Sequence, residues 1–334
     1  MTLFFESDDI RQLATPQVCL AAAQHSLKAE TAGRTALPPR IDVDSPTGFI
    51  RAMPAVLDDV MGLKVMTLVR GLGTRYLVLL YATSDGSLRG VFDADELTRL
   101  RTATYTTVAA RLMVASPPER LAVLGSGFEA EGHLRALASA WPLSDVAVYS
   151  RTAARREEFA SRLGAELGLT VSSCATAREA VDQADVVLLA TKSTTPVLDG
   201  QDLRHGAVVL SIGSTRPDLR ELDRATLARS GTVLVDDPRQ VVMESGDIIE
   251  ALQQGDLEES RLVPVAKAAL DPELLRREAG RDLLTFKSVG TALQDLALAR
   301  AVLAAAETAG CGRELGDLAA LKPFAGSAPL AVSR

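Results

Sequence analysis

The chain has 334 residues, of which 47% are hydrophobic and 24% are charged, and its net charge is −7. This length is enough for roughly two domains with buried cores. The negative net charge argues against nucleic acid as a partner. No apolar run approaches the roughly 18 residues that a membrane-spanning helix needs, so we expect no membrane partner. The first residues, MTLFFESDDI, carry acids and no basic stretch, unlike a signal peptide, and we expect a cytoplasmic protein.

The cysteines and histidines predict no metal site. Cys19, Cys174 and Cys311 lie far apart and form no CxxC pair. Three isolated cysteines fit a reducing compartment and are expected to be small buried side chains. The histidines also lack metal-ligand spacing. His133 lies in a segment with helical periodicity, where we expect it at the surface of an amphipathic helix.

The first 115 residues have the pattern of a mixed α/β region. A helix is predicted around residues 18–27, and residues 48–53, 63–68 and 76–81 have strand character. The sequence SDGS, residues 84–87, predicts a hairpin turn in which Asp-Gly supplies positive φ angles.

A longer helix is expected next, over ADELTRLRTATYTTVAARLMVA. Asp95 or its neighbour is a candidate cap for this helix. The residues expected on its buried face are Leu97, Leu100, Val108, Leu112 and Met113.

After SPPER, at 116–120, short apolar runs alternate with helical segments. The strands are predicted at residues 121–124, 146–149, 186–189, 208–212 and 233–235, and the helices at 127–139, 153–166 and 176–183. Short continuous apolar strands that alternate with helices are typical of a parallel sheet covered on both faces. The pattern therefore predicts a doubly wound α/β domain.

A glycine-rich segment, GSGFEA, closes the first of these strands and opens a helix. Gly125 would form the tight turn, Gly127 would let the backbone approach a pyrophosphate, and Ala130 would keep helix and strand close. Ser126, Phe128 and Glu129 complete the segment, whose helix N-terminus would face the phosphates. An ordinary strand-to-helix turn is the alternative. The position after the first strand of a doubly wound domain favours a dinucleotide site.

The end of the second strand favours NADP(H), with NAD(H) possible. A carboxylate is expected there when the ribose carries a free 2′-hydroxyl. The sequence instead has VYSRTAARR, which places Ser150, Arg151 and Thr152 at that position. An arginine beside two hydroxyls suits a 2′-phosphate. The alternative is a solvated basic turn.

Near the end of the chain, FKSVGTALQDLALARAVLAAAE predicts a helix after a Ser-Val-Gly turn, with an apolar face that packs against a large surface. The tail, KPFAGSAPLAVSR, is expected to be loose.

Several motifs together resemble the ornithine cyclodeaminase/mu-crystallin family. They are MPAVLDDVMGLK, LTRLRTATYTT, VLGSGFEAEGHLRAL, GSTRPDLRELD, VDDPRQVVMESGDI and TFKSVGTALQDLALA, in that order along the chain. The resemblance implies hydride transfer between a nicotinamide and the Cα–N bond of an amino or imino acid. It also implies a discontinuous α+β substrate and dimerisation domain, residues 1–115 plus 289–334, with a Rossmann domain, residues 116–288, inserted in it. A homodimer is the expected assembly.

The resemblance assigns roles to individual residues. Arg40 and Arg101 resemble arginines that bind the substrate carboxylate, and Lys64 resembles the lysine beside the reacting carbon and nitrogen. A bidentate arginine would fix Cα in front of the nicotinamide. Solvated side chains are the alternative for each, although the apolar neighbours of Lys64 argue against it. Thr191, Ser288 and Gly290 are the remaining residues expected at the cofactor.

Thr215 departs from the family pattern and favours one activity. Cyclodeaminases and alanine dehydrogenases of the family carry an aspartate there as a base, and threonine cannot take up a proton at neutral pH. A reductase that receives a protonated imine needs no such base. The sequence RPDLREL also resembles the ketimine reductase branch. We therefore expect NADPH-dependent reduction of a ketimine or α-imino acid to an L-amino acid.

The alternatives are a cyclodeaminase for ornithine or lysine that uses bound NAD, an alanine- or opine-type dehydrogenase, and a non-catalytic NADPH-binding protein. The partner in each enzymatic case is a small imino or amino acid with a carboxylate.

Overall fold

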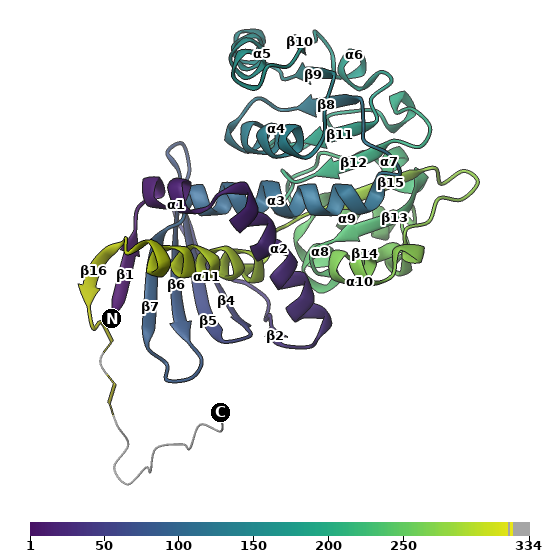
Figure 1. Cartoon of the computed structure of the whole chain (residues 1–334). Helices are drawn as coiled ribbons and strands as arrows, with labels where there is room; N and C mark the ends of the chain where they lie inside the picture. Colours follow the sequence, from purple (N-terminus) through teal and green to yellow (C-terminus); the bar gives the residue numbers. More distant parts are fainter. Residues whose placement is uncertain (320, 323–334) are drawn as a thin grey trace.

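The computed structural model describes residues 1–319, 321 and 322, and their strands form two sheets (Figure 1). One sheet takes its strands from both ends of the chain, and we call it the terminal sheet. The other is built from the middle of the chain, and we call it the central sheet. The predicted loose tail lies outside the described residues from position 323 onward.

The terminal sheet follows the order β16-β1-β7-β6-β5-β4-β2, with β3 paired to β4. Its strands are β1 (Thr2–Phe5), β2 (Thr35–Ala36), β3 (Ile41–Ser45), β4 (Gly48–Leu57), β5 (Val60–Val69), β6 (Gly73–Ala82), β7 (Leu88–Asp93) and β16 (Arg313–Gly316). Strands β4 to β7 form an antiparallel meander, and β1 joins it in parallel to β7.

One face of this sheet is covered by α11 (Ala292–Ala309). Gly62 lets the helix approach closely, because a Cβ there would lie 2.5 Å from Cδ2 of Leu296. Lys64 pairs across the sheet with Met53 and Val78, so these side chains share the covered face. The covered face of β5 therefore carries a lysine among apolar side chains.

The helices α1 (Ser7–Leu13), α2 (Pro16–Thr31) and α3 (Asp95–Met113) pack beside α11. In α2, the Oγ1 of Thr15 caps the first turn by accepting a hydrogen bond from the Val18 amide at 3.3 Å. The cap of α3 is the neighbour of Asp95, which the prediction included. Ala94 is the cap residue, without a side-chain cap, and Asp95 is the first helical residue, where its charge suits the helix dipole.

The turn before β7 is longer than a two-residue hairpin. Gly86 has a φ of 71°, but Asp85 does not adopt a positive φ, so that part of the prediction is wrong. The carboxylate of Asp85 instead accepts a hydrogen bond from the Ser87 amide at 2.9 Å. The side chain thus stabilises a wider turn, in which only the glycine needs the left-handed conformation.

The central sheet confirms the doubly wound α/β prediction. All its strand pairs are parallel, in the order β10-β9-β8-β11-β12-β15-β13-β14. The strands are β8 (Arg120–Leu124), β9 (Asp145–Tyr149), β10 (Val171–Ser173), β11 (Val186–Leu189), β12 (Val208–Ser211), β13 (Ser230–Val235), β14 (Leu262–Pro264) and β15 (Leu283–Lys287). From β8 the chain adds β9 and β10 on one side, and it then crosses over to add β11 and β12 on the other side of β8. Ligands bind at such a crossover point, here between β8 and β11.

The α-helices of the central part cover both faces of this sheet (Figure 1). They are α4 (Phe128–Ala140), α5 (Ala153–Leu167), α6 (Ala177–Val181), α7 (Arg224–Arg229), α8 (Pro238–Glu244), α9 (Gly246–Gln254) and α10 (Val265–Leu270). All four residues of β11 are buried, as expected for a strand with helices on each side.

Two sequence expectations are corrected here, and a third is confirmed. His133 is fully buried rather than at the surface, and Cys311 is exposed, whereas Cys19 is buried as expected. The C-terminal helix begins at Ala292, after the Ser-Val-Gly turn as expected, and Phe286 before that turn lies in β15.

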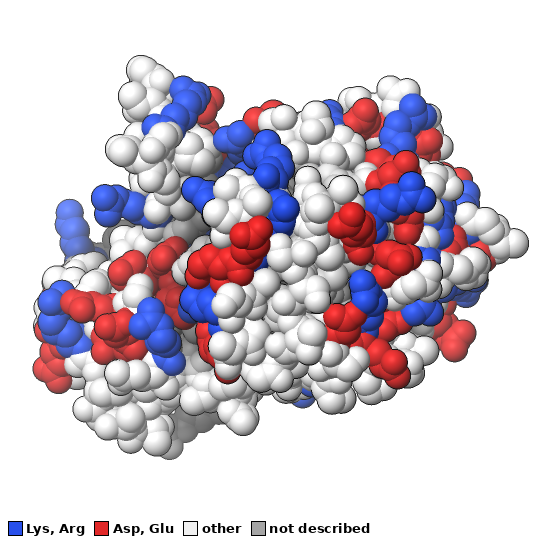
Figure 2. All heavy atoms as spheres, turned by 90° about the horizontal axis from the view of Figure 1, so that it is seen from above, with Lys and Arg blue, Asp and Glu red and all other residues white. Residues whose placement is uncertain are grey.

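No helix among the described residues is long and apolar enough to cross a membrane. On the face that Figure 2 shows, basic side chains (blue) and acidic side chains (red) are interspersed. This mixed surface lacks the continuous basic area that nucleic-acid binding uses.

Candidate active site

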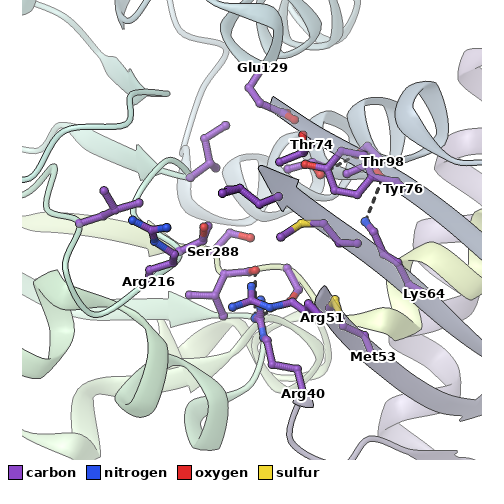
Figure 3. A pocket seen from close by; sticks show the side chains of 18 of the residues that line it. Arg40, Arg51, Met53, Lys64, Thr74, Tyr76, Thr98, Glu129, Arg216 and Ser288 are labelled. Carbon is purple, nitrogen blue, oxygen red and sulfur yellow. Dashed lines mark hydrogen bonds between the residues drawn. The ribbon is translucent and has the colours of Figure 1, made fainter. Parts of the chain in front are cut away.

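A cavity of about 490 Å³ lies where the terminal and central sheets meet (Figure 3). The predicted site residues that line it are Arg40, Lys64, Arg101, Glu129, Thr215, Ser288 and Gly290. Gly125, Ser126, Gly127, Phe128 and Ala130 form the turn into α4, which brings Glu129 to the cavity. Ser150, Arg151, Thr152 and Thr191 are not among the lining residues. The predicted residues therefore divide into a cavity group and a group along the edge of the central sheet.

The glycine turn has the geometry of a phosphate cradle. Gly125 has a φ of 127°, and a Cβ there would lie 2.5 Å from the Ala190 carbonyl oxygen. Gly127 is the cap residue of α4, and a Cβ added to it would have no other atom within 4 Å apart from its chain neighbours. Ala130 is fully buried against the strand. A phosphate can thus reach the backbone amides at the start of α4, so these residues fit a dinucleotide.

The segment after β9 carries cations, and the first turn of the helix that follows it contains no acid. Ser150 accepts a hydrogen bond at its Oγ from Ser126 Oγ, at 2.9 Å, which ties it to the glycine turn. Arg151 and Thr152 are exposed. Helix α5 has no acid in its first turn, where Arg155 and Arg156 lie instead. Cations at a helix N-terminus are unfavourable unless an anion joins them, and a bound phosphate would be such an anion.

Lys64 is held by a buried carboxylate. Its Nζ donates hydrogen bonds to Asp295 Oδ1 at 2.9 Å and to Thr98 Oγ1 at 2.8 Å (Figure 3 shows the latter). The side chain is 2% exposed, and that of Asp295 is fully buried. Burial lowers the pKa of Lys64 to about 8, although the charge of Asp295 opposes the shift. The ammonium also lies 4.9 Å from the ring centre of Tyr76.

Arg101 shares the same carboxylate from the other side. Its Nε donates to Asp295 Oδ1 at 2.9 Å, and its Nη1 donates to Gln294 Oε1 at 2.7 Å. Gly290 packs against the guanidinium, because a Cβ there would lie 2.7 Å from Nη1. Lys64 and Arg101 are therefore two cations around one buried acid at the edge of the cavity.

The turn that carries Ser288 and Gly290 is fixed by Asp236. Its Oδ2 accepts hydrogen bonds from Ser288 Oγ at 2.7 Å and from the Val289 and Gly290 amides at 2.8 Å. Gln294 donates to Oδ1 at 2.8 Å. The hydroxyl of Ser288 thus donates to the protein, and its oxygen can still accept a hydrogen bond at the cavity that Ser288 lines.

Arg40 reaches the cavity from the loop before β3. Its Nη2 donates to the Val289 and Gly290 carbonyls at 3.2 Å, and the side chain forms an ion pair with Glu244 at the end of α8. Burial raises the pKa of Glu244 to about 7 and lowers the pKa of Arg40. A substrate carboxylate at Arg40 would compete with Glu244.

The loops after β11 and β12 are held by the buried Glu221. Its Oε1 accepts from Thr191 Oγ1 at 2.8 Å, and its Oε2 accepts from Ser211 Oγ at 2.9 Å and the Gly213 amide at 2.7 Å. Thr191 is therefore bound to the protein through its side chain. Thr215, two residues beyond Gly213, lines the cavity and places no carboxylate there.

Four functional acids were missed in the sequence: Asp236, Glu244, Glu221 and Asp295. Asp295 had a signal, since it is the single charge in the apolar run ALQDLALA. The described residues contain no group of three or more potential metal ligands.

The central sheet and its glycine turn define a Rossmann-type α/β protein with a second, antiparallel-rich sheet. The chain belongs to the ornithine cyclodeaminase/mu-crystallin family, whose model matches residues 2–310. It is 31% identical over 263 residues to the ketimine reductase mu-crystallin of Mus musculus, covering 76% of this chain and 80% of the relative. It is 26% identical over 325 residues to a Δ1-pyrroline-2-carboxylate reductase of Bacillus cereus, covering 94% and 99%.

Solved structures agree with this membership. The Δ1-pyrroline-2-carboxylate reductase of Thermococcus litoralis, in complex with NADH and L-proline, matches with a TM-score of 0.87 and 26% identity, covering 94% of this chain and all of that one. A probable ornithine cyclodeaminase of Bordetella pertussis matches with a TM-score of 0.87 and 30% identity, covering 93% and 99%. By this membership the chain is an oxidoreductase.

Proposed function

We propose that this protein reduces a cyclic ketimine or α-imino acid to an L-amino acid with NADPH. The observation that carries the proposal is the arrangement of Lys64 and Arg101 around Asp295, at the same cavity that Glu129 lines from the helix after the glycine turn. The names of the relatives, ketimine reductase and Δ1-pyrroline-2-carboxylate reductase, support the same chemistry. Residues 116–288 would bind the dinucleotide, and residues 1–115 with 289–334 would bind the substrate.

The cationic groups would bind and orient the substrate carboxylate. Arg101 and Arg40 lie on either side of Gly290, so a carboxylate between them can accept hydrogen bonds from both guanidinium groups. Lys64 adds a positive charge on the covered face of the sheet. When bound, the nicotinamide dinucleotide supplies the hydride that reduces the imine carbon. The residues fix that carbon in one position, which is how orientation lowers the barrier.

The cofactor preference for NADP(H) is supported by the segment after β9. Arg151 is exposed, and α5 begins with two more arginines and no acid. A 2′-phosphate would accept hydrogen bonds from Arg151 and from the hydroxyls of Ser150 and Thr152.

The rest of the cavity favours an apolar substrate body. Its wall includes Phe49, Met53, Met66, Leu68 and Ile212. The methylene groups of a cyclic ketimine would be buried against these side chains. Thr215 supplies no base for removing an amine, which favours reduction over cyclodeamination.

The proposal is tested by following NADPH oxidation with Δ1-pyrroline-2-carboxylate, Δ1-piperideine-2-carboxylate, and pyruvate plus ammonia. We expect oxidation with at least one cyclic ketimine. Ammonia release from ornithine, without added reductant or net cofactor turnover, would show a cyclodeaminase and refute the proposal.

We also propose a homodimer through the uncovered face of the terminal sheet. The side chains that alternate away from α11 are mostly apolar along three strands, with Thr67 and Arg75 as exceptions. Several of them are exposed although large: Ile50, Val56, Val69 and Leu77, with Ile41 and Val43 on β3. An exposed apolar face of this extent is typical of a protein interface, and a second copy buries it symmetrically. The three free cysteines support a reducing, cytoplasmic compartment.

A further inference from the structure

Glu129 is the one carboxylate among the described residues that line the cavity, whereas six of those residues are cationic. The cations are Arg40, Arg51, Lys64, Arg101, Lys192 and Arg216. Figure 3 shows the Glu129 carboxylate on the side of the cavity that carries Thr74, Tyr76 and Thr98. The lining therefore holds a single acid among cations, and the charges that act on this acid include those of Lys64 and Arg101.

The backbone of Glu129 is fixed, but its carboxylate is unpaired. His133 Nδ1 donates a hydrogen bond to the Glu129 carbonyl at 2.7 Å, and Thr106 Oγ1 donates to His133 Nε2 at 3.1 Å. With this pattern His133 is neutral, and burial lowers its pKa to about 4. The Oε2 of Glu129 is buried without a hydrogen-bond partner among the described residues. A buried polar atom of this kind is typical of a site that a ligand completes.

Charged groups face Glu129 from several elements. Arg99 and Arg101 lie on α3 with Asp95, Lys64 lies on β5, Lys192 follows β11, Tyr76 lies on β6, and His133 follows on α4. The side chain of Glu129 is 36% exposed, but desolvation of its carboxyl group raises the pKa, and the four cations only partly oppose the shift. The carboxyl group therefore holds a proton at higher pH than an ordinary glutamate.

We propose that the Glu129 side chain binds the substrate nitrogen and donates the proton that the imine nitrogen receives. This inference rests on the proposed function, since it assigns a group to the same reaction. Substrates of this type carry a carboxylate and a nitrogen on one carbon. When the cations bind the carboxylate, the nitrogen can reach Glu129, the one carboxyl group among the described residues that line the cavity.

The reaction balances with this assignment. The imine nitrogen uses its lone pair to take the proton of the Glu129 carboxyl group, which becomes a carboxylate. The hydride adds to the imine carbon, and the C=N π pair becomes the lone pair of the amine. The imine gains two electrons and the nicotinamide loses two. Water then returns a proton to Glu129.

Neighbouring groups are less suited to this step. Thr215 does not transfer a proton at neutral pH. Lys64 donates hydrogen bonds to Asp295 and Thr98, so two of its three N–H groups are occupied. Glu129 has no such partner, and it can form its first hydrogen bond with the substrate.

The test compares Glu129→Gln with Glu131→Gln. Glutamine keeps the size of the side chain and cannot transfer a proton. Glu131 lies in the same helical turn, where it pairs with Arg135 and Arg162 and does not line the cavity. For Glu129→Gln, we expect kcat/KM with Δ1-pyrroline-2-carboxylate to fall about 100-fold, the usual effect of losing a general acid. The wild-type decrease in kcat with rising pH, as Glu129 loses its proton, should also disappear, while the rise in KM above pH 8 that Lys64 causes should remain. Glu131→Gln should keep both the rate and the pH profile.

A binding measurement separates the nitrogen contact from the structure of the helix. L-proline carries a charged nitrogen, whereas pyrrole-2-carboxylate carries a neutral one. By calorimetry, Glu129→Gln should weaken L-proline about tenfold and leave pyrrole-2-carboxylate and NADPH unchanged. A wild-type protein that reduces no ketimine overturns the proposed function and this inference with it. An active wild type with an unchanged pH profile and L-proline affinity in Glu129→Gln overturns this inference alone.

Discussion

Replacing Asp295 with asparagine should destabilise the protein in a way that depends on pH. Asp295 Oδ1 lies 2.9 Å from both Lys64 Nζ and Arg101 Nε, and all three side chains are at most 9% exposed. Breaking a buried ion pair by removing one partner costs about 3–5 kcal/mol. We therefore expect Asp295→Asn to lower the free energy of unfolding by about 3–5 kcal/mol at pH 7.

Part of this loss should disappear at higher pH. Without Asp295, Lys64 can become neutral in the folded protein. At pH 7, converting Lys64 to its neutral form costs the folded wild type about 1.4 kcal/mol, because the pKa of Lys64 is about 8, one unit above that pH. Above pH 8, Lys64 is already neutral in the folded wild type, so the free-energy cost of neutralising its ammonium group is absent. Between pH 7 and 8, the folded variant binds fewer protons than the folded wild type. The free energy of unfolding of the variant, relative to that of the wild type, therefore rises with pH.

Urea unfolding followed by circular dichroism at pH 7 and pH 9 measures both effects. The loss caused by Asp295→Asn should be about 1.4 kcal/mol smaller at pH 9. The control is the same substitution in a Lys64→Met background, where the loss should not change with pH. An equal loss at both pH values, or the same pH dependence without Lys64, would refute the electrostatic reasoning.

Four other outcomes follow from the site. The KM for a ketimine should rise above pH 8 as Lys64 loses the proton that binds the carboxylate, and Lys64→Arg should flatten that profile. Arg151→Ala should weaken NADPH about tenfold in a fluorescence titration and leave NADH nearly unchanged, and equal loss for both would contradict the assignment. Leu77→Asp should convert a dimer to a monomer in light scattering, and a wild-type monomer at micromolar concentration would exclude the dimer. Thr215→Asp should raise the KM for the substrate carboxylate by placing a like charge in the cavity, without producing ammonia release from ornithine.

The central sheet was predictable because its strands are short and continuously apolar. Residues 121–124 and 186–189 were identified from this signal alone, and both strands are buried. Strand β10 was missed, since Val171–Ser173 is partly exposed and contains two serines. Strand β15 was missed because Phe286 precedes the long helical pattern closely, and local sequence does not locate the turn between them.

The cationic half of the site was easier to identify than its acids. Lys64 lies among apolar neighbours in a strand, where a buried ammonium group requires a charged or polar partner. Its partner Asp295 lies 231 residues away along the chain, so no local pattern joins them. His133 was misplaced for a related reason, since its partner Thr106 belongs to another helix, α3. Periodicity predicts which face of a helix is apolar, but not which polar group is satisfied by a distant element.

The turn at residues 288–290 shows how one short segment can serve both sheets. It begins where β15 of the central sheet ends, and α11, which covers the terminal sheet, starts two residues after it. Asp236 holds its backbone amides from the central side, while Arg40 and Arg101 contact Gly290 from the terminal side. Because Gly290 has a φ of 73° and no room for a Cβ, its conformation sets the distance between the two arginines. The arginines that we propose bind the carboxylate are thereby positioned relative to the central sheet, whose glycine turn fits the dinucleotide, so one short turn would align substrate and cofactor.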